Sequence, residues 1–479
     1  MRRSTPSLAV LNRAAALTVM LLAAVRFCHV DVLWVEEAYP LAAARAILAG
    51  KALYRDIWFD KPPLFATFYV LLGAPTGVLL RVFGFLFVCF TAWAAWRAAR
   101  QLWPRSESAP VWAALLTAFF LTFDFPATAM ALTPDLLAVP FHLLAVGSMA
   151  AGQPLVAGIC CGLALGCNSK AVLILLVCLA WRWRQAPRLL AGFAVPVAAV
   201  IAWMSSQGAL LAHWQQVWVW GAAYSKDTPL AQPLLEGVRR TLAWAGFHVA
   251  IVAAAALALV REREQRWRIG LWIAVSLVAA WMGWRFFPRY FFQLLPAVAL
   301  PAAYGFAQAP RRWRVALASL LFVPLLRFAP ASIQLGLETL QGRPHASHDL
   351  ALFNDARQAA VFVPEPARGQ GALVWGYRPE LYSLAGLQPG TRFLDSQPLN
   401  GVLADRHLTD SRPTFPELAR QNRESLLQTN PPEWIFDGLG PVNPRLAVWD
   451  ESTGLAAWRP LYGEVGRTPT VVVYRRIGR

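Results

Sequence analysis

Charge is scarce in this sequence of 479 residues. Charged side chains make up 15% of the chain against 57% for hydrophobic ones, and the mean hydropathy is +0.43. Two or three soluble domains would be the ordinary expectation for this length, but long apolar runs separated by arginine clusters exclude it. The sequence also lacks internal repeats and low-complexity tracts. The composition therefore indicates a polytopic membrane protein.

Cysteine is scarce as well, and its positions exclude two kinds of site. Residues 331–479 contain no cysteine. No disulfide framework and no thiolate zinc site can be inferred from this spacing. All six cysteines lie in apolar runs: Cys28, Cys89, Cys160, Cys161, Cys167 and Cys178.

Lysine is the rarest charged residue, since only four of the 44 basic side chains are lysines. They are Lys51, Lys61, Lys170 and Lys226, and all fall on the outward side of the topology predicted below. An ammonium differs from a guanidinium in geometry and hydration, and ionisable groups at membrane depth are costly. We therefore expect functional roles for at least Lys61 and Lys170.

Eleven apolar runs predict membrane-spanning helices, because about 20 residues cross a bilayer core of about 30 Å. When these runs alternate in direction, all the arginine clusters fall on one side of the membrane, beginning with Arg2, Arg3 and Arg13. An excess of arginine marks the cytoplasmic face. Two runs are short, but fusing them would move the next two arginine clusters outside, so they are kept separate. The predicted spans are 14–30, 77–99, 109–125, 135–151, 154–168, 171–181, 189–206, 241–260, 269–284, 290–308 and 315–330.

The net charge of +17 lies entirely in the first 330 residues, because residues 331–479 hold equal numbers of arginines and acids. The basic clusters stand where membrane topology requires them, so binding of nucleic acid is not expected. The N-terminus "MRRSTPSLAVLNR" resembles a signal sequence without a clear cleavage site, which favours an uncleaved first span.

The sequence divides into a membrane body, residues 1–330, and a soluble domain, residues 331–479, placed outside by the same alternation. The tail, residues 331–479, contains both helical spacing and short strand-like runs, which predicts a small α/β layer. The fold class is thus mainly α, with an extracytoplasmic α/β domain. In the tail, "HDLALFNDARQAAVFV" has helical spacing, and "GALVWGY", "TRFLD", "PEWIFDG" and "PTVVVYRRI" are typical of short strands.

The first outward loop, residues 31–76, is not an irregular connector. "EEAYPLAAARAILAG" predicts a helix on the membrane surface, with acids and Pro40 in its first turn and Gly50 as its stop. "KPPLFATFYVLLGAPTG" predicts a second short helix. Charged side chains in this loop are therefore held on short surface elements.

Four side chains of this loop are candidate catalytic residues: Glu36, Glu37, Asp60 and Lys61. Acids in a first helical turn interact favourably with the helix dipole, at about 0.3–1 kcal/mol each, and this capping role alone could explain Glu36 and Glu37. The same dipole keeps a carboxylate ionised, as a general base requires. Asp60 and Lys61 could form an exposed ion pair of little energetic consequence, but the scarcity of lysine favours a function. Tyr39 and Asp56 are secondary candidates.

Further candidates stand at the outward ends of later runs. In "GWRFFPRYFFQLLP", Arg285, Arg289 and Tyr290 combine two arginines with aromatic rings, and such a pair can hold a phosphate through several donors. Lys170 joins them as a candidate for binding a donor phosphate. Asp124 and Asp135 are secondary candidates, although Asp135 also suits a helix start after Thr133 and Pro134.

These motifs together resemble the GT-C superfamily of integral membrane glycosyltransferases, in particular the bacterial aminoarabinose transferases and the protein O-mannosyltransferases. "EEAYP" and "FDKPPL" are the most specific parts, and "RFFPRYFFQLLP" is similar to a late outward loop of the bacterial enzymes. In the family, the first acid of the loop acts as or orients the catalytic base. It is usually aspartate, and its position matches Glu36 here. The acid-lysine pair of the family matches Asp60 and Lys61.

The resemblance implies a reaction and a location. A polyprenyl-phosphate sugar would be the donor, and a glycan, lipid or protein would supply the acceptor hydroxyl or phosphate, with inversion at the anomeric carbon. The protein would lie in the bacterial cytoplasmic membrane as a multi-pass protein, with its C-terminal domain on the extracytoplasmic side. No cofactor is demanded: the four carboxylates of the loop could hold a divalent cation, but no His/Asp/Glu spacing requires one.

Two other function classes compete with this one. A secondary transporter or flippase for a lipid-linked or anionic substrate would place charges near the bilayer midplane and show paired halves, whereas here the acids cluster in an outward loop. A non-catalytic membrane scaffold would leave the loop acids and the lysine distribution unexplained. The transporter remains the alternative.

Overall fold

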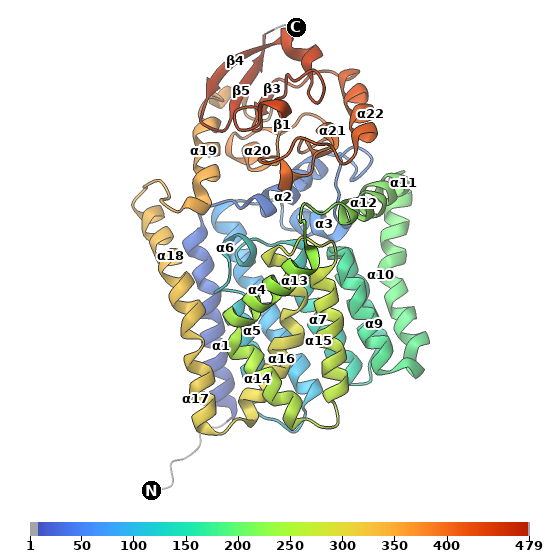
Figure 1. Cartoon of the computed structure of the whole chain (residues 1–479), viewed down its shortest axis with the longest axis vertical. Helices are drawn as coiled ribbons and strands as arrows, with labels where there is room; N and C mark the ends of the chain where they lie inside the picture. The colour runs from blue at the N-terminus through green and yellow to red at the C-terminus, as the bar shows by residue number, and fades with distance from the viewer. Residues whose placement is uncertain (1–7, 478–479) are drawn as a thin grey trace.

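The computed structural model describes residues 8–477, so Arg2 and Arg3 of the first arginine cluster lie outside the described range. The chain is mostly helical and is arranged in three levels (Figure 1). A bundle of long helices forms one end, an α/β domain forms the other, and short helices lie between them. The predicted combination of a helical body and a small C-terminal α/β layer is confirmed.

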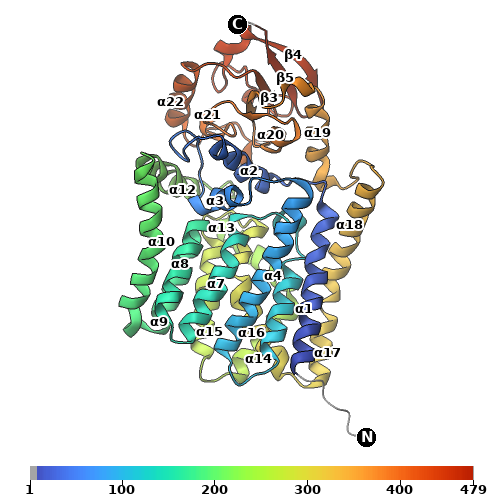
Figure 2. The ribbon, with the colours of Figure 1, turned by 180° about the vertical axis from the view of Figure 1, so that it is seen from behind.

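The bundle is built from apolar helices that pack side by side, as two opposite views agree (Figures 1 and 2). The short runs at 154–168 and 171–181 form separate helices, α8 and α9, as predicted. The bundle contains α1 (Leu8–Ala24), α4 (Gly77–Leu102), α5 (Ala109–Phe120), α7 (Pro134–Ala150), α8 (Pro154–Cys167), α9 (Val172–Trp181), α10 (Ala186–Ser206), α14 (Val249–Arg261), α15 (Arg266–Trp281), α16 (Leu295–Gln308), α17 (Arg311–Ser319) and α18 (Phe322–Leu340). α13 (Pro233–Phe247) lies at the end of the bundle nearest the C-terminal domain.

Several of these helices have the length and composition of membrane spans, and the chain is a multi-pass membrane protein. Within the described residues, three stretches are long and apolar enough on their own: Gly77–Leu102, Trp183–Ser206 and Arg311–Leu340. Others, such as α7 and α8, are apolar but shorter. The number of about eleven spans stays a prediction. The last stretch runs on to Leu340, so the predicted domain boundary at residue 330 falls within α18.

The predicted span 241–260 is wrong as a single helix, because the chain bends by 92° between α13 and α14. The break lies at His248, whose Nδ1 is 2.9 Å from the carbonyl oxygen of Trp244 and whose Nε2 is 3.4 Å from the Asp124 carboxylate. Its ring also stacks on that of Trp244, with centroids 4.4 Å apart. The apolar pattern runs on through the break, so hydropathy alone could not reveal it.

Between the bundle and the C-terminal domain lie the short helices of the outward loops. They are α2 (Val35–Leu48), α3 (Pro63–Leu71), α6 (Pro126–Ala129), α11 (Leu210–His213) and α12 (Trp220–Lys226). Both helices predicted in the first outward loop are confirmed as α2 and α3. However, α2 does not lie open on a surface: most of it is buried, and the C-terminal domain covers it (Figure 1).

The C-terminal domain, residues 341–477, surrounds a five-stranded sheet in the order β2-β1-β3-β5-β4. β1 pairs in parallel with β2 and β3, whereas β5 is antiparallel to β3 and β4. Its strands are β1 (Gly371–Trp375), β2 (Gln388–Pro389), β3 (Trp434–Asp437), β4 (Tyr462–Arg467) and β5 (Val472–Arg476), and its helices are α19 (Ala351–Ala360), α20 (Glu380–Leu384), α21 (Gln397–Asn400) and α22 (Pro416–Leu427).

Three of the four predicted strands and the predicted helix of this domain are confirmed as β1, β3, β5 and α19. The strand predicted for "TRFLD", residues 391–395, is wrong: the Arg392 carbonyl accepts a hydrogen bond from Trp58 N–H, 2.6 Å away, and not from a strand neighbour. This segment instead joins the domain to the first outward loop, which is a long-range contact that local pattern does not encode.

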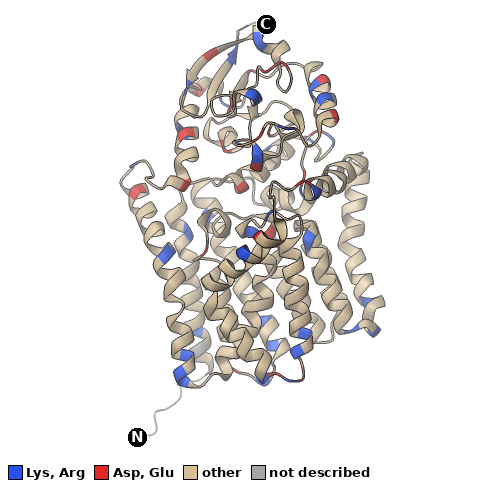
Figure 3. Cartoon of the chain, in the orientation of Figure 1, with Lys and Arg blue, Asp and Glu red and all other residues tan. Residues whose placement is uncertain are grey.

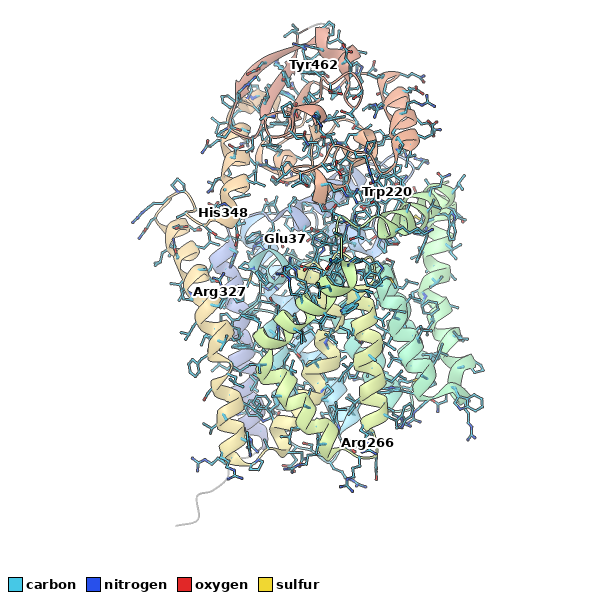
Figure 4. The ribbon with its side chains drawn as sticks, in the orientation of Figure 1. Glu37, Trp220, Arg266, Arg327, His348 and Tyr462 are labelled. Atoms are coloured by element: carbon cyan, nitrogen blue, oxygen red, sulfur yellow. The ribbon has the colours of Figure 1, made fainter. Side chains whose placement is uncertain are left out.

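Lysine and arginine positions gather at the end of the bundle that lies farthest from the C-terminal domain (Figure 3). Figure 4 marks Arg266, at the start of α15, at this far end. This is the arrangement expected if that end faces the cytoplasm and the domain lies on the opposite side.

Candidate active site

A cavity of about 340 Å³ lies between the bundle and the layer of short helices. Its polar lining comes from segments far apart in the sequence: the loop before α3, the start of α7, the α8–α9 connection, and the turn η5 (Pro288–Gln293). α12 supplies another wall. The candidate residues that line it are Asp60, Lys61, Asp135, Lys170, Arg289 and Tyr290.

Three cations face this cavity, and each is held differently. Lys61 Nζ is 2.6 Å from the Asp60 carboxylate. Lys170 Nζ lies over the ring of Tyr290, 3.0 Å from its centroid, and is buried without a hydrogen-bond partner among the described residues. A buried donor normally finds a partner, so this ammonium is available to a ligand.

The third cation, Arg289, is shared by two carboxylates. Its guanidinium forms an ion pair with Glu36 of α2, and its Nε is 3.7 Å from Asp135 Oδ2. Asp135 is itself fixed, because its Oδ1 accepts hydrogen bonds from Asn168, at 2.9 Å, and from Gln293, at 3.3 Å. Glu36 itself is not a lining residue of the cavity; its link to the cavity is its ion pair with Arg289, which lines it.

The loop that carries Asp60 and Lys61 is held by its backbone. Gln216 accepts a hydrogen bond from Phe59 N–H at 2.8 Å, and the Tyr54 hydroxyl donates to the Lys61 carbonyl at 2.7 Å. Pro62 and Pro63 then lead directly into α3, where proline suits the first turn. The two charged side chains are thus placed by a rigid connection.

Glu37 occupies a different environment from Glu36. It is fully buried, and its two carboxylate oxygens lie 3.0 and 2.7 Å from the Arg81 guanidinium. Leu132 N–H donates to the same carboxylate at 3.2 Å. Figure 4 shows Glu37 between the bundle and the domain, and it does not line the cavity. The side chain ties α2 to the bundle.

Three other candidate residues lie apart from the cavity lining. Arg285 Nε donates to Asp405 of the C-terminal domain at 2.8 Å, and its other nitrogens donate to backbone carbonyls. Asp124 pairs with His248 at the helix break. Asp56 pairs with Arg55 on the surface, and the hydrogen bonds from that guanidinium lower the pKa of the Asp56 carboxyl to about 2.

Tyr39 lies beneath the Asp60 loop, stacked on Phe59 with ring centroids 5.1 Å apart. Its hydroxyl accepts a hydrogen bond from Asp60 N–H at 3.4 Å. Burial, followed by the charge of Asp60, raises the pKa of Tyr39 well above its ordinary value. Tyr39 thus stays neutral and supports the loop that holds Asp60.

Sequence reasoning missed the contribution of the C-terminal domain. Tyr377, which follows β1, has its ring centroid 5.7 Å from that of Tyr39. Asp395 is buried nearby, and burial raises the pKa of its carboxyl to about 7, with Asp60 adding to the effect. One signal could have indicated them: both follow the parallel strands β1 and β2, and the carboxyl ends of parallel strands commonly carry site residues.

An apolar groove of about 570 Å³ lies next to the polar cavity, between α8 and α10. The two spaces share Pro62 and Trp218 as lining residues. Gly162 and Gly166 of α8 allow close packing beside the groove. An added Cβ would lie 2.3 Å from Pro196 Cγ at the first position and 2.6 Å from Leu64 Cδ1 at the second. A charged site and an apolar channel thus stand side by side.

No group of three or more His, Cys, Asp or Glu side chains within residues 8–477 is arranged to hold a metal ion. The carboxylates around the cavity are instead paired with cations of the protein, Asp60 with Lys61 and Glu36 with Arg289. Their arrangement suits the binding of an anion and the removal of a proton.

Solved structures with a similar fold are membrane glycosyltransferases. ArnT from Cupriavidus metallidurans matches in its apo state, with 13% identity and a TM-score of 0.57 over 96% of this chain and 97% of that one. The same enzyme bound to undecaprenyl phosphate matches with 15% identity and a TM-score of 0.55, over 97% of both chains. The apo oligosaccharyltransferase of Archaeoglobus fulgidus matches with 12% identity and a TM-score of 0.50, over 94% of this chain and 73% of that one.

No family model and no curated protein matches the sequence itself. The likeness therefore lies in the fold, and it extends over nearly the whole chain. The chain has the GT-C fold, as the motifs of its first outward loop predict.

Proposed function

We propose that this protein is a membrane glycosyltransferase that moves a sugar from a polyprenyl-phosphate donor to an acceptor hydroxyl or phosphate. The observation that carries the proposal is the pairing of two spaces. Lys61, Lys170 and Arg289 line a polar cavity, and an apolar groove begins where that cavity ends. A lipid phosphate needs both, because its phosphate requires cations and its chain requires an apolar channel.

The solved structure of ArnT with undecaprenyl phosphate supports this choice of donor, since that enzyme has the same fold. Lys170 supports it from within the chain: its buried ammonium has no hydrogen-bond partner among the described residues and lines the cavity. In the proposed complex, the polyprenyl chain occupies the groove between α8 and α10, and the phosphate contacts Lys170, Lys61 and Arg289.

The reaction follows from these positions. Glu36 takes the proton of the acceptor hydroxyl, and the acceptor oxygen forms a bond to the anomeric carbon of the sugar. The bond from that carbon to the phosphate oxygen breaks, and the electron pair leaves with the lipid phosphate. The phosphate changes from a diester with one negative charge to a monoester with two, and the three cations stabilise the added charge. Attack opposite the leaving group inverts the anomeric carbon.

Glu37 and Arg285 take supporting roles in this proposal. Glu37 anchors the first turn of α2, which carries Glu36, through its buried pair with Arg81. Arg285 links the C-terminal domain to the body through Asp405. The enzyme would lie in the bacterial cytoplasmic membrane, with the cavity and the C-terminal domain at the extracytoplasmic face, in agreement with the basic far end of the bundle.

In the test, native membranes that contain the protein are incubated with a panel of polyprenyl-phosphate sugars. Release of the free lipid phosphate is then followed. Glu36→Gln removes the proposed base, so turnover should fall by roughly 10² to 10⁴. Donor binding should be kept or strengthened, because Arg289 loses the carboxylate that competes with the phosphate. Asp56→Asn is the matched control, because Asp56 lies in the same loop but pairs with Arg55 at the surface. It should retain full turnover.

Two results would contradict the proposal. Full activity of Glu36→Gln would remove Glu36 from the role of base. Transfer of an intact labelled donor across vesicles, with no cleavage of any donor in the panel, would favour the flippase.

A further inference from the structure

A second apolar groove, of about 700 Å³, lies between α12 and the end of α15. It adjoins the polar cavity, because Ser225, Met282 and Gly283 line both spaces. The first groove, between α8 and α10, meets the same cavity at Pro62 and Trp218. The polar cavity therefore adjoins two apolar grooves, and the proposed function uses only one of them.

One wall joins the two grooves. The π-helix η4 (Trp214–Val219) and α12 run along the cavity, with Trp218 at the first groove and Ser225 at the second. Figure 4 marks Trp220 on this wall, between the bundle and the C-terminal domain. At the rise of a helix, Trp218 and Ser225 are about 10 Å apart along its axis. An amphiphile in each groove would thus bring two headgroups into one cavity from different sides.

The second groove lies at the outward end of the bundle. Its wall on α15 carries Val278 and Trp281, and Trp284 follows in the next loop; Val278 and Trp284 are exposed. α15 starts at Arg266, at the basic far end of the bundle, so these residues stand at the opposite end of its predicted span. Tryptophan is enriched at the boundary between membrane and water. The groove is therefore placed where the apolar part of a membrane amphiphile lies.

The loop beyond α15 is held in a set conformation. Gly283 has a φ of +89° and Trp284 a φ of +52°, a region that residues other than glycine rarely adopt. The Thr228 hydroxyl donates a hydrogen bond to the Trp284 carbonyl at 2.8 Å, and Arg285 pairs with Asp405. Contacts with α12's following loop and with the C-terminal domain thus fix this side of the groove.

One charge stands in the lining of the second groove, the ammonium of Lys226. Lys226 is exposed and forms no hydrogen bond or ion pair within residues 8–477. Lys51, by contrast, donates to the Pro389 carbonyl at 2.8 Å. An unpaired ammonium at a membrane surface attracts anionic headgroups. An apolar groove with this charge suits an amphiphile whose headgroup is negative.

We propose that the second groove binds the acceptor, and that the acceptor is a membrane amphiphile with an anionic headgroup that carries hydroxyls. Its apolar part lies along α15, Lys226 holds the anionic group, and a hydroxyl extends past Gly283 into the polar cavity. Glu36 takes the proton of that hydroxyl there, since its partner Arg289 lines the cavity. This assignment rests on the proposed glycosyltransferase function and adds the class and the entry route of the second substrate.

The class of acceptor is tested with the purified full-length protein in phosphatidylcholine vesicles, supplied with a polyprenyl-phosphate sugar that it cleaves in native membranes. The organic-solvent extract of the native membranes should raise donor cleavage above the rate in the vesicles alone. The delipidated remainder should not. Cleavage restored by the remainder alone, or by neither fraction, would overturn the proposal.

The groove itself is tested with variants in the same vesicles. Val278→Trp narrows it and Lys226→Gln removes its charge, so each should raise the half-saturating amount of extract by roughly threefold to tenfold. The half-saturating donor concentration should stay unchanged, and Lys226→Arg should remain close to the wild type. Val78→Trp is the matched control, because Val78 is equally exposed at the outward start of α4 and lies outside the lining of both spaces. A raised donor requirement with an unchanged extract requirement would assign the second groove to the donor and refute the proposal.

A second measurement does not depend on turnover. In a Lys226→Cys variant, mass spectrometry follows the rate at which a maleimide modifies residue 226. The extract should slow this modification several-fold, whereas undecaprenyl phosphate should not. Equal protection by undecaprenyl phosphate, or no protection by the extract, would overturn the assignment to the acceptor. Absence of donor cleavage by the wild type in native membranes would instead refute the proposed function, so the two failures can be told apart.

Discussion

The variant Asp395→Asn should be more stable than the wild type, by a margin that grows as the pH rises. Asp395 is 2% exposed, and burial raises the pKa of its carboxyl from 3.8 to about 7. A carboxyl whose pKa is raised by folding favours the folded state while it stays protonated, below about pH 4. That contribution is lost as the pH rises through about 7, because ionisation in the folded protein is then opposed by burial and by Asp60.

The size of the effect follows from the difference between the two pKa values. About three pKa units at 1.36 kcal/mol each give a loss of at most about 4 kcal/mol between pH 4 and pH 8. Asparagine cannot ionise, and its side-chain carbonyl can still accept the hydrogen bond that Gln397 N–H now donates at 2.8 Å. The variant should therefore be close to the wild type at pH 4 and more stable at pH 8.

Thermal unfolding of the C-terminal domain within the whole protein would measure this, with the difference in Tm between variant and wild type taken at each pH. A change of about 4 kcal/mol corresponds to roughly 14 °C for a domain of this size. Asp56→Asn is the control, since the pKa of Asp56 is lowered to about 2 and its contribution is already complete above pH 4. A difference for Asp395→Asn that stays constant from pH 4 to pH 8 would refute the reasoning.

Three further predictions concern the body of the protein. Glu37→Gln should lower the free energy of unfolding by about 3–5 kcal/mol, because it leaves the buried Arg81 guanidinium without its counter-charge; an unchanged Tm would contradict this. Lys61→Arg should lower kcat at least tenfold despite keeping the charge, whereas Lys51→Arg, outside the cavity lining, should be silent. Leu165→Trp should fill the apolar groove and raise the KM for long-chain donors while leaving that for short-chain donors unchanged.

The sequence predicted the charged part of the site because charges are scarce in it. Asp60, Lys61, Lys170 and Arg289 stand at the outward ends of apolar runs, where an isolated charge is costly unless it is paired or used, and all four line the cavity. The same reasoning also selected Arg285, which pairs with Asp405 of the C-terminal domain. Residue type and position along the chain could not distinguish the two arginines.

The contribution of the C-terminal domain could not be predicted, because it depends on how two distant parts of the chain pack. Tyr377 and Asp395 gain their significance from Tyr39 and Asp60, more than 300 residues away. Their position after parallel strands marks this edge of the sheet as a place for site residues, but it does not say which part of the membrane body the edge meets. The break at His248 was missed for a related reason, since the acid that pairs with it, Asp124, lies in the distant turn between α5 and α6.

The ion pair between Arg289 and Glu36 has a consequence for the order in which the two substrates bind. In the protein without substrate, its guanidinium is occupied by Glu36 and lies near Asp135. An arriving phosphate must compete for the same nitrogen atoms, so occupation of the cavity weakens the hold on Glu36. The Glu36 carboxylate is then released from Arg289 only after the lipid carrier is in place. We therefore expect ordered kinetics, in which the carrier binds first and the second substrate follows.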